Sequence, residues 1–300
     1  MRAVWSFWSH PFNAYKGKIW ARPLHHMLAW GLSLHTARQH YPETVLITDT
    51  PGKRLLVDQL GLSFTEVSTE LDRLQHVDIG WWALGKLVAY NLQDRPFLHI
   101  DSDVFLWKRL PQHLEVAPVV AQSPEHFHTI HDAFGPREIE QVFSANDLQL
   151  PTEWEWMRSR DPERFREENC GILGGCDIPF LRYYSGLAID LATNPAHRPT
   201  WNLFAEKECF TMLIEQFSLA ACIDFHRFHP TSPFRGVGIQ YLFPTFEDSL
   251  DSNQAARVGF THLLGGSKSH SGVGQRIEAR MRRDDPAYFQ RCESLLQRMI

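Results

Sequence analysis

Two aspartates, two residues apart, follow an apolar run in the first half of the chain. The run Phe97–Ile100 leads directly into Asp101, Ser102 and Asp103. Because side chains alternate along a strand, a strand here would place both carboxylates on one face. Carboxylates this close repel each other unless a cation lies between them, and Mg²⁺ or Mn²⁺ held in this way completes its shell with substrate phosphates. The pair therefore predicts a metal that bridges the protein to a diphosphate, with a solvated strand-end turn as the alternative.

Other polar residues lie where they could contact a ligand. Lys86 falls in a predicted helix among Trp, Leu and Val, so its ammonium needs a partner or a route to water. Asn169 precedes a short apolar strand, and an amide can both donate to and accept from hydroxyls. Glu215 and Gln216 lie on a predicted helix. The alternatives are ordinary structural roles: a helix lysine that reaches solvent, a turn residue and a polar helix face.

The elements that must position these residues alternate between strands and helices in the first half. Strands joined through helices form βαβ units, so the alternation predicts a mostly parallel sheet. Ligands bind beyond the carboxyl ends of such strands, which places Trp5–Ser9, Asp49 and Asp101–Asp103 near one rim. The predicted strands are 3–8, 44–48, 63–67 and 96–100, and the predicted helices are 23–40, 53–60 and 80–92, with a turn at 49–52 and a glycine cap at 61.

The second half of the chain is less regular. A strand at 119–122 precedes a long polar and aromatic stretch, 126–168, which is predicted to be an insertion with short helices of its own. The predicted elements that follow are a strand at 169–175, a helix at 201–223, a strand at 257–264 and a loop at 265–268. Asp285-Pro286 predicts the start of a terminal helix, because aspartate is a good N-cap and proline suits the first helical position.

Composition excludes several classes of protein. The 300 residues are 43% hydrophobic and 22% charged, which is typical of a globular chain. The 30 basic and 35 acidic residues give a net charge of −5, which argues against nucleic acid as a partner because phosphate neutralisation needs excess Lys and Arg. No apolar run reaches the length of a transmembrane segment, and the first residues lack a signal-peptide pattern. Five cysteines without a paired spacing favour reduced thiols and a cytoplasmic location.

An aspartate pair after an apolar strand resembles the nucleotide-sugar motif of the GT-A-fold glycosyltransferases. Further segments resemble motifs of family 8 of these enzymes, the glycogenin and galactosyltransferase group, and they occur in the family's order across residues 1–270. These segments are Trp82-Ala83-Leu84-Gly85-Lys86-Leu87, Asn169-Cys170-Gly171-Ile172, Glu215-Gln216 and His262-Leu263-Leu264-Gly265-Gly266-Ser267-Lys268. The last segment matches the family's His-x-x-Gly-x-x-Lys pattern, and the shared order makes the set more specific than any one motif.

The resemblance implies a GT-A fold, which is a Rossmann-like α/β fold with a mostly parallel twisted sheet flanked by helices, here with an irregular helical insertion. It implies one catalytic domain over 1–275, with a nucleotide-binding half at 1–124 and the insertion at 125–168. The acceptor half and the metal-binding loop would follow at 169–275, and 276–300 would form a C-terminal helix.

The resemblance also implies roles for particular side chains near the diphosphate. Asp101, Asp103 and His262 stand at the family's metal-ligand positions, and an imidazole ligand suits Mn²⁺ better than Mg²⁺. Lys268 would contact the pyrophosphate as a point charge, assisted by backbone N–H groups of the glycine turn at Gly265.

The donor sugar has its own expected contacts. Lys86 would reach the sugar or a phosphate, and Asn169 would hydrogen-bond to sugar hydroxyls. Glu215 and Gln216 would bind the sugar or face the reacting carbon. The family usually has Asp where this chain has Glu215.

The nucleoside is expected at the end of the first strand. Trp8 would stack on the uracil base and Ser6 would hydrogen-bond to it, although the family's Tyr-x-x-Gly has no counterpart here. Asp49 would reach the base or the ribose, or would only begin a turn. Ser102, between the two aspartates, is expected to contact the donor.

These expectations describe a metal-dependent glycosyltransferase that moves a sugar from a nucleotide-sugar donor, UDP-linked by resemblance, with retention of configuration. The acceptor is not indicated and ranges from a glycan or lipid-linked sugar to a protein or small molecule, and the oligomeric state is equally open. One alternative is a GT-A-like protein that binds a nucleotide or glycan without turnover. Another is a phosphohydrolase of the haloacid-dehalogenase type, in which Thr or Val usually stands where this chain has Phe105.

Overall fold

The computed structural model describes residues 1–14, 19–129 and 134–299. The chain divides into two compact units. The first unit comprises Arg2–Gln75, His99–Leu110 and Ser252–Ile300, and the second comprises His76–Leu98 and Pro111–Asp251 together with Met1. The expected insertion falls in the second unit, and its residues 130–133 lie outside the described residues.

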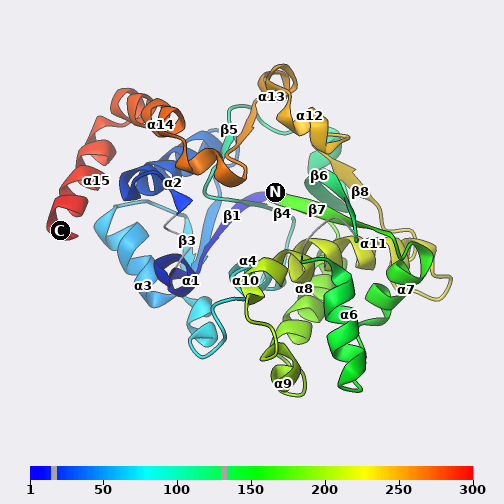
Figure 1. Cartoon of the computed structure of the whole chain (residues 1–300). Helices are drawn as coiled ribbons and strands as arrows, with labels where there is room; N and C mark the ends of the chain where they lie inside the picture. Colours follow the sequence, from blue (N-terminus) through cyan, green and yellow to red (C-terminus); the bar gives the residue numbers. More distant parts are fainter. Residues whose placement is uncertain (15–18, 130–133, 300) are drawn as a thin grey trace. The chain divides into compact units, whose positions relative to one another are not determined.

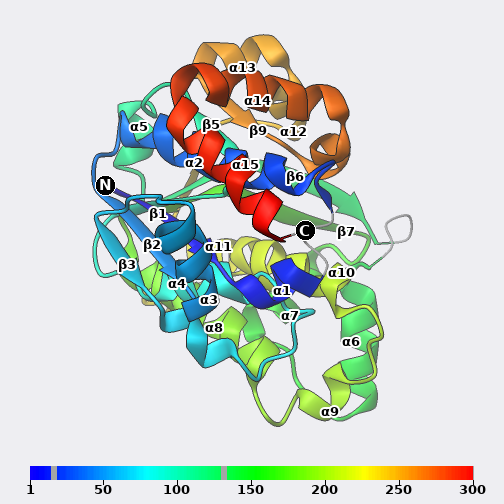
Figure 2. The same ribbon diagram turned by 90° about the vertical axis from the view of Figure 1, so that its left-hand side faces the viewer.

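Three parallel strands form the centre of the first unit (Figure 2). β1 (Arg2–Phe7) pairs with β2 (Thr44–Thr48), and β2 pairs with β3 (Glu66–Ser68). Every residue of β2 is buried, as expected for a parallel strand that is covered on both faces. The predicted strands at 3–8 and 44–48 are confirmed to within one residue, whereas the third strand begins three residues later than predicted.

Helix α2 (Pro23–Arg38) packs against α14 (Ser271–Asp284) and α15 (Pro286–Met299) (Figure 1). A Cβ at Gly31 would lie 2.3 Å from the ring of Tyr288, so the glycine permits this close approach. Asp285 accepts a hydrogen bond from the backbone of Tyr288 at 2.9 Å, which confirms the predicted N-cap. The chain end is nevertheless two helices that break at this cap, and not one helix from residue 276.

The turn predicted at 49–52 is in fact the start of a helix. Asp49 caps α3 (Thr50–Lys53) by accepting a hydrogen bond from the backbone of Gly52 at 2.8 Å. The helix continues as the π-helical segment η2 (Arg54–Gln59), and Gly61 with φ +69° follows it, as predicted.

A separate antiparallel ribbon joins β5 (Val104–Leu106) to β9 (Phe260–His262). The strand predicted at 257–264 is shorter than expected because α13 (Ser252–Val258) occupies its first residues. Gly259, with φ +71°, separates α13 from β9, and its N–H bonds to the carbonyl of Ala255.

A long hairpin forms the sheet of the second unit. β6 (Val119–His128) pairs antiparallel with β7 (Arg164–Gly175), and β8 (Ile239–Tyr241) pairs parallel with β6. Both hairpin strands are much longer than predicted, so they extend into the expected insertion. The short helices predicted there are α6 (Pro136–Ala145) and α7 (Thr152–Arg160).

The other helices of this unit include α4 (Leu84–Asn91), which packs on α8 (Ile178–Thr193). The helix predicted at 201–223 is divided into α10 (Lys207–Met212), the π-helical η4 (Leu213–Phe217) and α11 (Ser218–Phe228). π-helical turns inside helices are frequently found at functional sites, and η4 contains both Glu215 and Gln216.

Seven strands belong to one sheet, in the order β3-β2-β1-β4-β7-β6-β8, where β4 is Phe97–Ile100. Together with the helices, this confirms the predicted α/β class with a mostly parallel sheet. The remaining short elements are α1 (Ser9–Ala14), η3 (Glu70–Leu74), α5 (Gln112–Glu115), α9 (Arg198–Trp201), α12 (Phe246–Leu250) and η5 (Gly265–Ser269).

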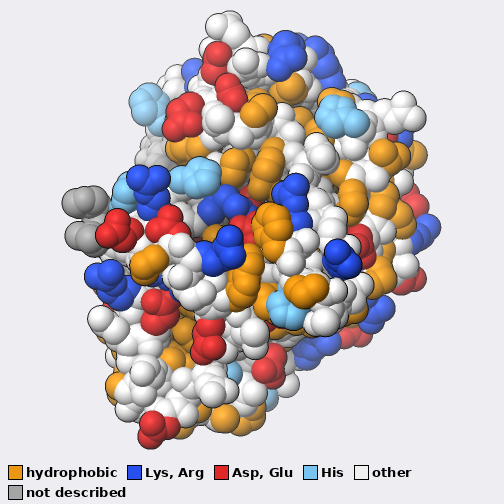
Figure 3. All heavy atoms as spheres, turned by 90° about the vertical axis from the view of Figure 1, so that its right-hand side faces the viewer, with side chains coloured by type: hydrophobic (Ala, Val, Ile, Leu, Met, Phe, Trp, Pro, Cys, Tyr) orange, Lys and Arg blue, Asp and Glu red, His pale blue; other side chains and the backbone are white. Residues whose placement is uncertain are grey.

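Surface and membrane properties agree with the composition. One face of the molecule intersperses basic and acidic side chains among apolar ones (Figure 3), in line with the small net charge. None of the helices in the described part of the chain combines the length and apolar character that a bilayer span needs. The five cysteines are free thiols; a cytoplasmic location stays a prediction.

Candidate functional site

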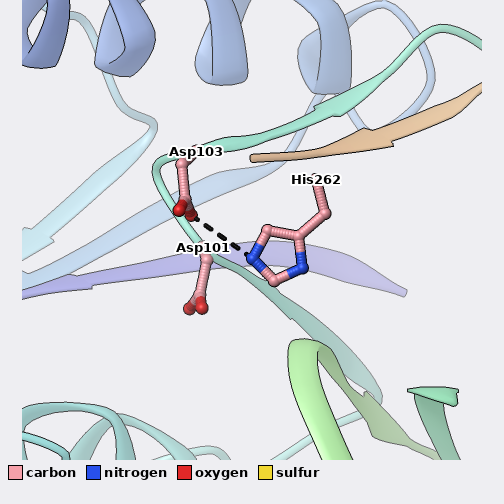
Figure 4. Close-up of side chains that lie close together, drawn as sticks. All are labelled: Asp101, Asp103 and His262. Carbon is pink, nitrogen blue, oxygen red and sulfur yellow. Dashed lines mark ion pairs between the residues drawn. The ribbon is translucent and has the colours of Figure 1, made fainter. Parts of the chain in front are cut away.

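Asp101, Asp103 and His262 lie close together in the first unit, as Figure 4 shows. Each offers one ligand atom, and these atoms lie within 4.8 Å of one another. The β5–β9 ribbon brings them together, since Val104 lies opposite His262 and the N–H of Leu263 donates to the carbonyl of Asp103 at 3.1 Å. Backbone hydrogen bonds between the two strands therefore hold His262 beside the aspartates, although the segments lie far apart in the sequence.

The two aspartates lie in a turn and not on the face of a strand. β4 ends at Ile100, and the N–H of Val104 donates to the carbonyl of Asp101 at 3.0 Å, which closes the turn. The hydroxyl of Ser33, on α2, donates to the same carbonyl at 3.3 Å. The expected proximity of the carboxylates is thus present, but a turn produces it in place of strand alternation. Ser102 lies half-buried at the middle of this turn.

The carboxylate of Asp103 is buried among positive groups. Lys268 forms an ion pair with Asp103 Oδ2, and His262 Nε2 lies 3.8 Å from Asp103 Oδ1. Burial raises the pKa of Asp103, but the charges of Lys268 and His262 lower it by more, so its pKa lies below the ordinary value. The group is therefore ionised at neutral pH, as a metal ligand must be.

Lys268 lies on η5, which follows the glycine at 265. Gly265 has φ +48°, a backbone conformation that glycine adopts without strain. The lysine was expected at a pyrophosphate, and in this structure its ammonium pairs with Asp103. The two observations are compatible, because one ammonium can exchange a carboxylate partner for a phosphate.

His26 and His99 are neighbours of this site that the sequence did not indicate. Burial lowers the pKa of His26 to about 3, and its Nε2 accepts a hydrogen bond from the indole of Trp30 at 3.0 Å, so the ring is neutral. His99 Nδ1 lies 3.7 Å from Asp101 Oδ1. The i, i+4 spacing of His26 and Trp30 on one helix is the sequence signal for their hydrogen bond.

Two of the residues expected around the nucleoside, Ser6 and Asp49, have hydrogen-bond partners inside the first unit. Ser6 Oγ lies 2.9 Å from His99 Nε2. Asp49 is 3% exposed and accepts hydrogen bonds from the N–H and hydroxyl of Ser9, in addition to its capping bond. Trp8 is buried, and no described residue hydrogen-bonds to its indole N–H. Asp49 therefore caps a helix, while nucleoside contacts from Asp49, Ser6 and Trp8 stay predictions.

Lys86 and Glu215 form an ion pair inside the second unit. Their Nζ and Oε1 atoms lie 3.1 Å apart, and the ammonium also donates to the carbonyl of Cys170 at 3.0 Å. Tyr90 donates its hydroxyl proton to Glu215 at 2.7 Å. Glu215 is fully buried, so this geometry fits a positioning role for the carboxylate better than direct contact with a reacting carbon.

Asn169 and Gln216 are also in the second unit. Asn169 donates to the carboxylate of Glu125 at 2.5 Å and accepts from the N–H of Gly171 at 3.0 Å. The amide oxygen of Gln216 is buried, and no described residue donates to it. The structure thus brings Asp101, Asp103, His262 and Lys268 into one site, and Lys86 and Glu215 into another.

The three grouped side chains suit a divalent metal. Two carboxylate oxygens and one imidazole nitrogen form a mixed O/N donor set that Mn²⁺ accepts well. The ion pair between Lys268 and Asp103 also shows that a ligand oxygen of this site accepts a cationic partner. The residues present therefore fit the ion that the sequence predicts.

Comparison with protein-family models gives one match. The model described as "Family of unknown function (DUF6734)" matches residues 1–295, which is nearly the whole chain. The chain belongs to this family. No curated protein sequence matches that of this DUF6734 member.

Solved structures similar to the chain include three glycosyltransferase structures. Galactosyltransferase LgtC in complex with donor and acceptor sugar analogs is 12% identical with a TM-score of 0.39, and an active-site mutant of LgtC is 12% identical with a TM-score of 0.41. Each match covers 93% of this chain and 94% of the other. The apo structure of the bifunctional glycosyltransferase WbbM is 11% identical with a TM-score of 0.38, and the match covers 93% of this chain and 51% of that one. Likenesses this low carry no argument about chemistry, which has to come from the residues of the site.

Proposed function

We propose that the chain is a metal-dependent glycosyltransferase that moves a sugar from a nucleotide-sugar donor to an acceptor. The observation that carries this proposal is the cluster of Asp101, Asp103 and His262, with ligand atoms within 4.8 Å of one another, beside the ammonium of Lys268. A divalent-ion site next to a separate lysine suits a nucleoside diphosphate, because the ion and the ammonium can share the phosphate charge.

The chemistry required of these residues is electrostatic. When bound, the metal would neutralise the charge that builds on the departing diphosphate. Asp101, Asp103 and His262 would hold the ion, and Lys268 would donate hydrogen bonds to a phosphate oxygen in place of its ion pair with Asp103. Charge separation of this kind accompanies the oxocarbenium-like state of the sugar, and preorganised positive groups lower its free energy.

The finer features of the proposal are a UDP-linked donor, Mn²⁺ and retention of configuration. The family-8 motif order supports the first and the last, and the imidazole ligand supports Mn²⁺ over Mg²⁺. Double displacement would need an accessible carboxylate such as Glu215. Because that carboxylate is fully buried and bound by Lys86 and Tyr90, front-face attack within an ion pair fits better.

A panel of nucleotide sugars incubated with the protein and Mn²⁺, followed by mass spectrometry, tests this function. We expect transfer to water or to an added acceptor from one UDP-sugar, and no reaction in EDTA. Metal-dependent binding of UDP without turnover would instead support a binding protein of the same fold. Phosphate release from a generic ester without nucleotide would support a phosphohydrolase.

His262→Ala is expected to weaken Mn²⁺-dependent UDP binding by at least about 10-fold, the lower end of what loss of an outer-shell partner costs at a metal site. The effect should be larger with Mn²⁺ than with Mg²⁺, since the imidazole favours Mn²⁺. Titration calorimetry with each metal measures it, and His35→Ala is the control, at a half-buried histidine on α2 whose Nε2 lies 3.2 Å from Gln39 Nε2. Equal affinities of the variant and the parent in Mn²⁺ would remove His262 from the ligand set.

Lys268→Ala is expected to slow sugar transfer by about 100-fold, the loss typical of one preorganised charge-stabilising donor. Circular dichroism must show that the variant folds, because Lys268→Ala also removes the counter-charge of the buried Asp103 carboxylate. Turnover at saturating donor measures the effect, and Lys53→Ala, at an exposed lysine of α3, is the matched control. Unchanged turnover would deny Lys268 the assigned role.

A further inference from the structure

Four polar side chains share one face of the β6–β7 hairpin. In the antiparallel register, Ser123 lies opposite Asn169 and Glu125 lies opposite Glu167. Residues two apart on a strand point to the same side, so all four side chains lie on one face. We call these four residues the hairpin quartet; Figure 1 shows the two strands that carry it.

The two carboxyl groups of the quartet face each other without a cation between them. Glu167 is only 7% exposed, and no described residue donates a hydrogen bond to its carboxyl. Glu125 accepts one, from Asn169 at 2.5 Å. Carboxylates directly opposite on neighbouring strands destabilise each other unless a proton or a cation lies between them. Burial, together with the charges of Glu125 and Glu215, accordingly raises the pKa of Glu167 to about 8.

Two basic side chains of the second unit that border the quartet's strands are bound to other carboxylates. Arg166 points to the opposite face of the hairpin, where it binds Glu168 at 2.8 Å and Asp224 at 3.0 Å. Lys86 is committed to Glu215. The protein itself therefore supplies no cation to the quartet from these neighbours.

Ser123 is a second and independent sign of a ligand. Its side chain is fully buried, and its hydroxyl has no hydrogen-bond partner among the described residues. The register places it on the same face as Glu125 and directly opposite Asn169. A buried hydroxyl without a partner is costly, so such groups normally meet a ligand or an ordered water.

The quartet is reachable through Glu125. This residue lines a cavity of about 310 Å³ together with His126, Phe127 and the segment from Pro244 to Glu247. The pairing of β6 with β8 ends at Ala121. The residues of β6 that line the cavity follow Ala121, so the cavity lies beside the unpaired edge of β6.

We propose that the hairpin quartet binds a primary ammonium group of a ligand. An ammonium carries three N–H donors and no acceptor, and it would meet three acceptors here in Glu125, Ser123 and Glu167, whose carboxyl gives up its proton when the cation binds. Asn169 holds the Glu125 carboxylate in place. The identification of the ligand as an amine-bearing acceptor, such as an amino sugar, rests on the proposed function. The binding of an ammonium group does not depend on that function.

Titration calorimetry with glucosamine, N-acetylglucosamine and glucose, in the absence of metal and nucleotide, tests this site. Glucosamine should bind at least about 10-fold more tightly than either neutral sugar, because only its amine is charged. Glu167→Gln, which keeps the side-chain shape, should weaken glucosamine binding by at least about 10-fold. Glu163→Gln, at an exposed glutamate of the same segment, should bind glucosamine like the parent.

Equal affinity for glucosamine and glucose, no glucosamine binding, or unchanged binding by Glu167→Gln would each overturn the proposal. If Glu167→Gln fails to fold, Glu125→Gln at the half-buried member of the pair provides the same comparison. Since these titrations contain no metal or nucleotide, their failure leaves the transferase proposal standing. Loss of Mn²⁺-dependent UDP binding, in turn, would not affect the ammonium site.

Discussion

Replacing Asp103 by Asn is expected to reduce Mn²⁺-dependent UDP binding by more than about 100-fold, because loss of an outer-shell partner alone costs a metal site about 10- to 100-fold. Asp103 is the buried member of the ligand group and the partner of both Lys268 and His262. Without that charge, the ammonium of Lys268 loses its partner and the metal loses an anionic ligand. Titration calorimetry with UDP in Mn²⁺ gives the affinity directly.

Asp58→Asn is the matched control for this variant, since Asp58 is an exposed aspartate of the same unit on η2. It should bind UDP like the parent. Circular dichroism must show that Asp103→Asn keeps its secondary structure. If the folded variant retained full UDP affinity in Mn²⁺, the metal assignment would be wrong.

Replacing Glu215 by Leu is expected to destabilise the fold by about 3–5 kcal/mol, the usual cost of removing one partner of a buried ion pair. The buried ammonium of Lys86 would lose the counter-charge of Glu215, and the hydroxyl of Tyr90 would lose its hydrogen bond to that carboxylate. Urea unfolding at neutral pH measures the free energy of unfolding. A change below about 1 kcal/mol, which surface substitutions commonly give, would contradict the pairing.

The double variant Lys86→Met with Glu215→Leu separates charge from packing. Replacement of a whole buried ion pair by apolar residues is often neutral, so the double variant should recover most of the stability lost by Glu215→Leu alone. Glu206→Leu, at an exposed glutamate before α10, is the control and should change little. A double variant no more stable than Glu215→Leu would attribute the loss to side-chain packing, and not to the broken ion pair.

Strong local patterns allowed much of the fold to be predicted. The apolar runs at 44–48 and 97–100 form β2 and β4, because a short apolar run is typical of a strand that is buried on both faces. β7 was predicted from its apolar half only. Its first half, from Arg164 to Glu168, is charged and has no apolar alternation, so only the long-range pairing with β6 identifies it as a strand.

The metal-ligand part of the candidate site was predictable, because its residues belong to recognisable sequence motifs. Asp101 and Asp103 come from one turn, and His262 joins them through the β5–β9 ribbon. The pairing of Lys86 with Glu215 was not predictable, because it depends on how α4 and η4 approach each other. The opposition of Glu125 and Glu167 was hidden for a similar reason, since a strand register cannot be read from two acidic segments alone.

The most direct test of the metal site is a calorimetric titration of the unmodified protein with UDP, performed once in Mn²⁺ and once in EDTA. We expect saturable binding of about one UDP per chain in Mn²⁺ and at least about 100-fold weaker binding in EDTA, because a bound ion would link the phosphates to the protein. Binding of equal strength in both buffers, or no binding in Mn²⁺, would contradict it.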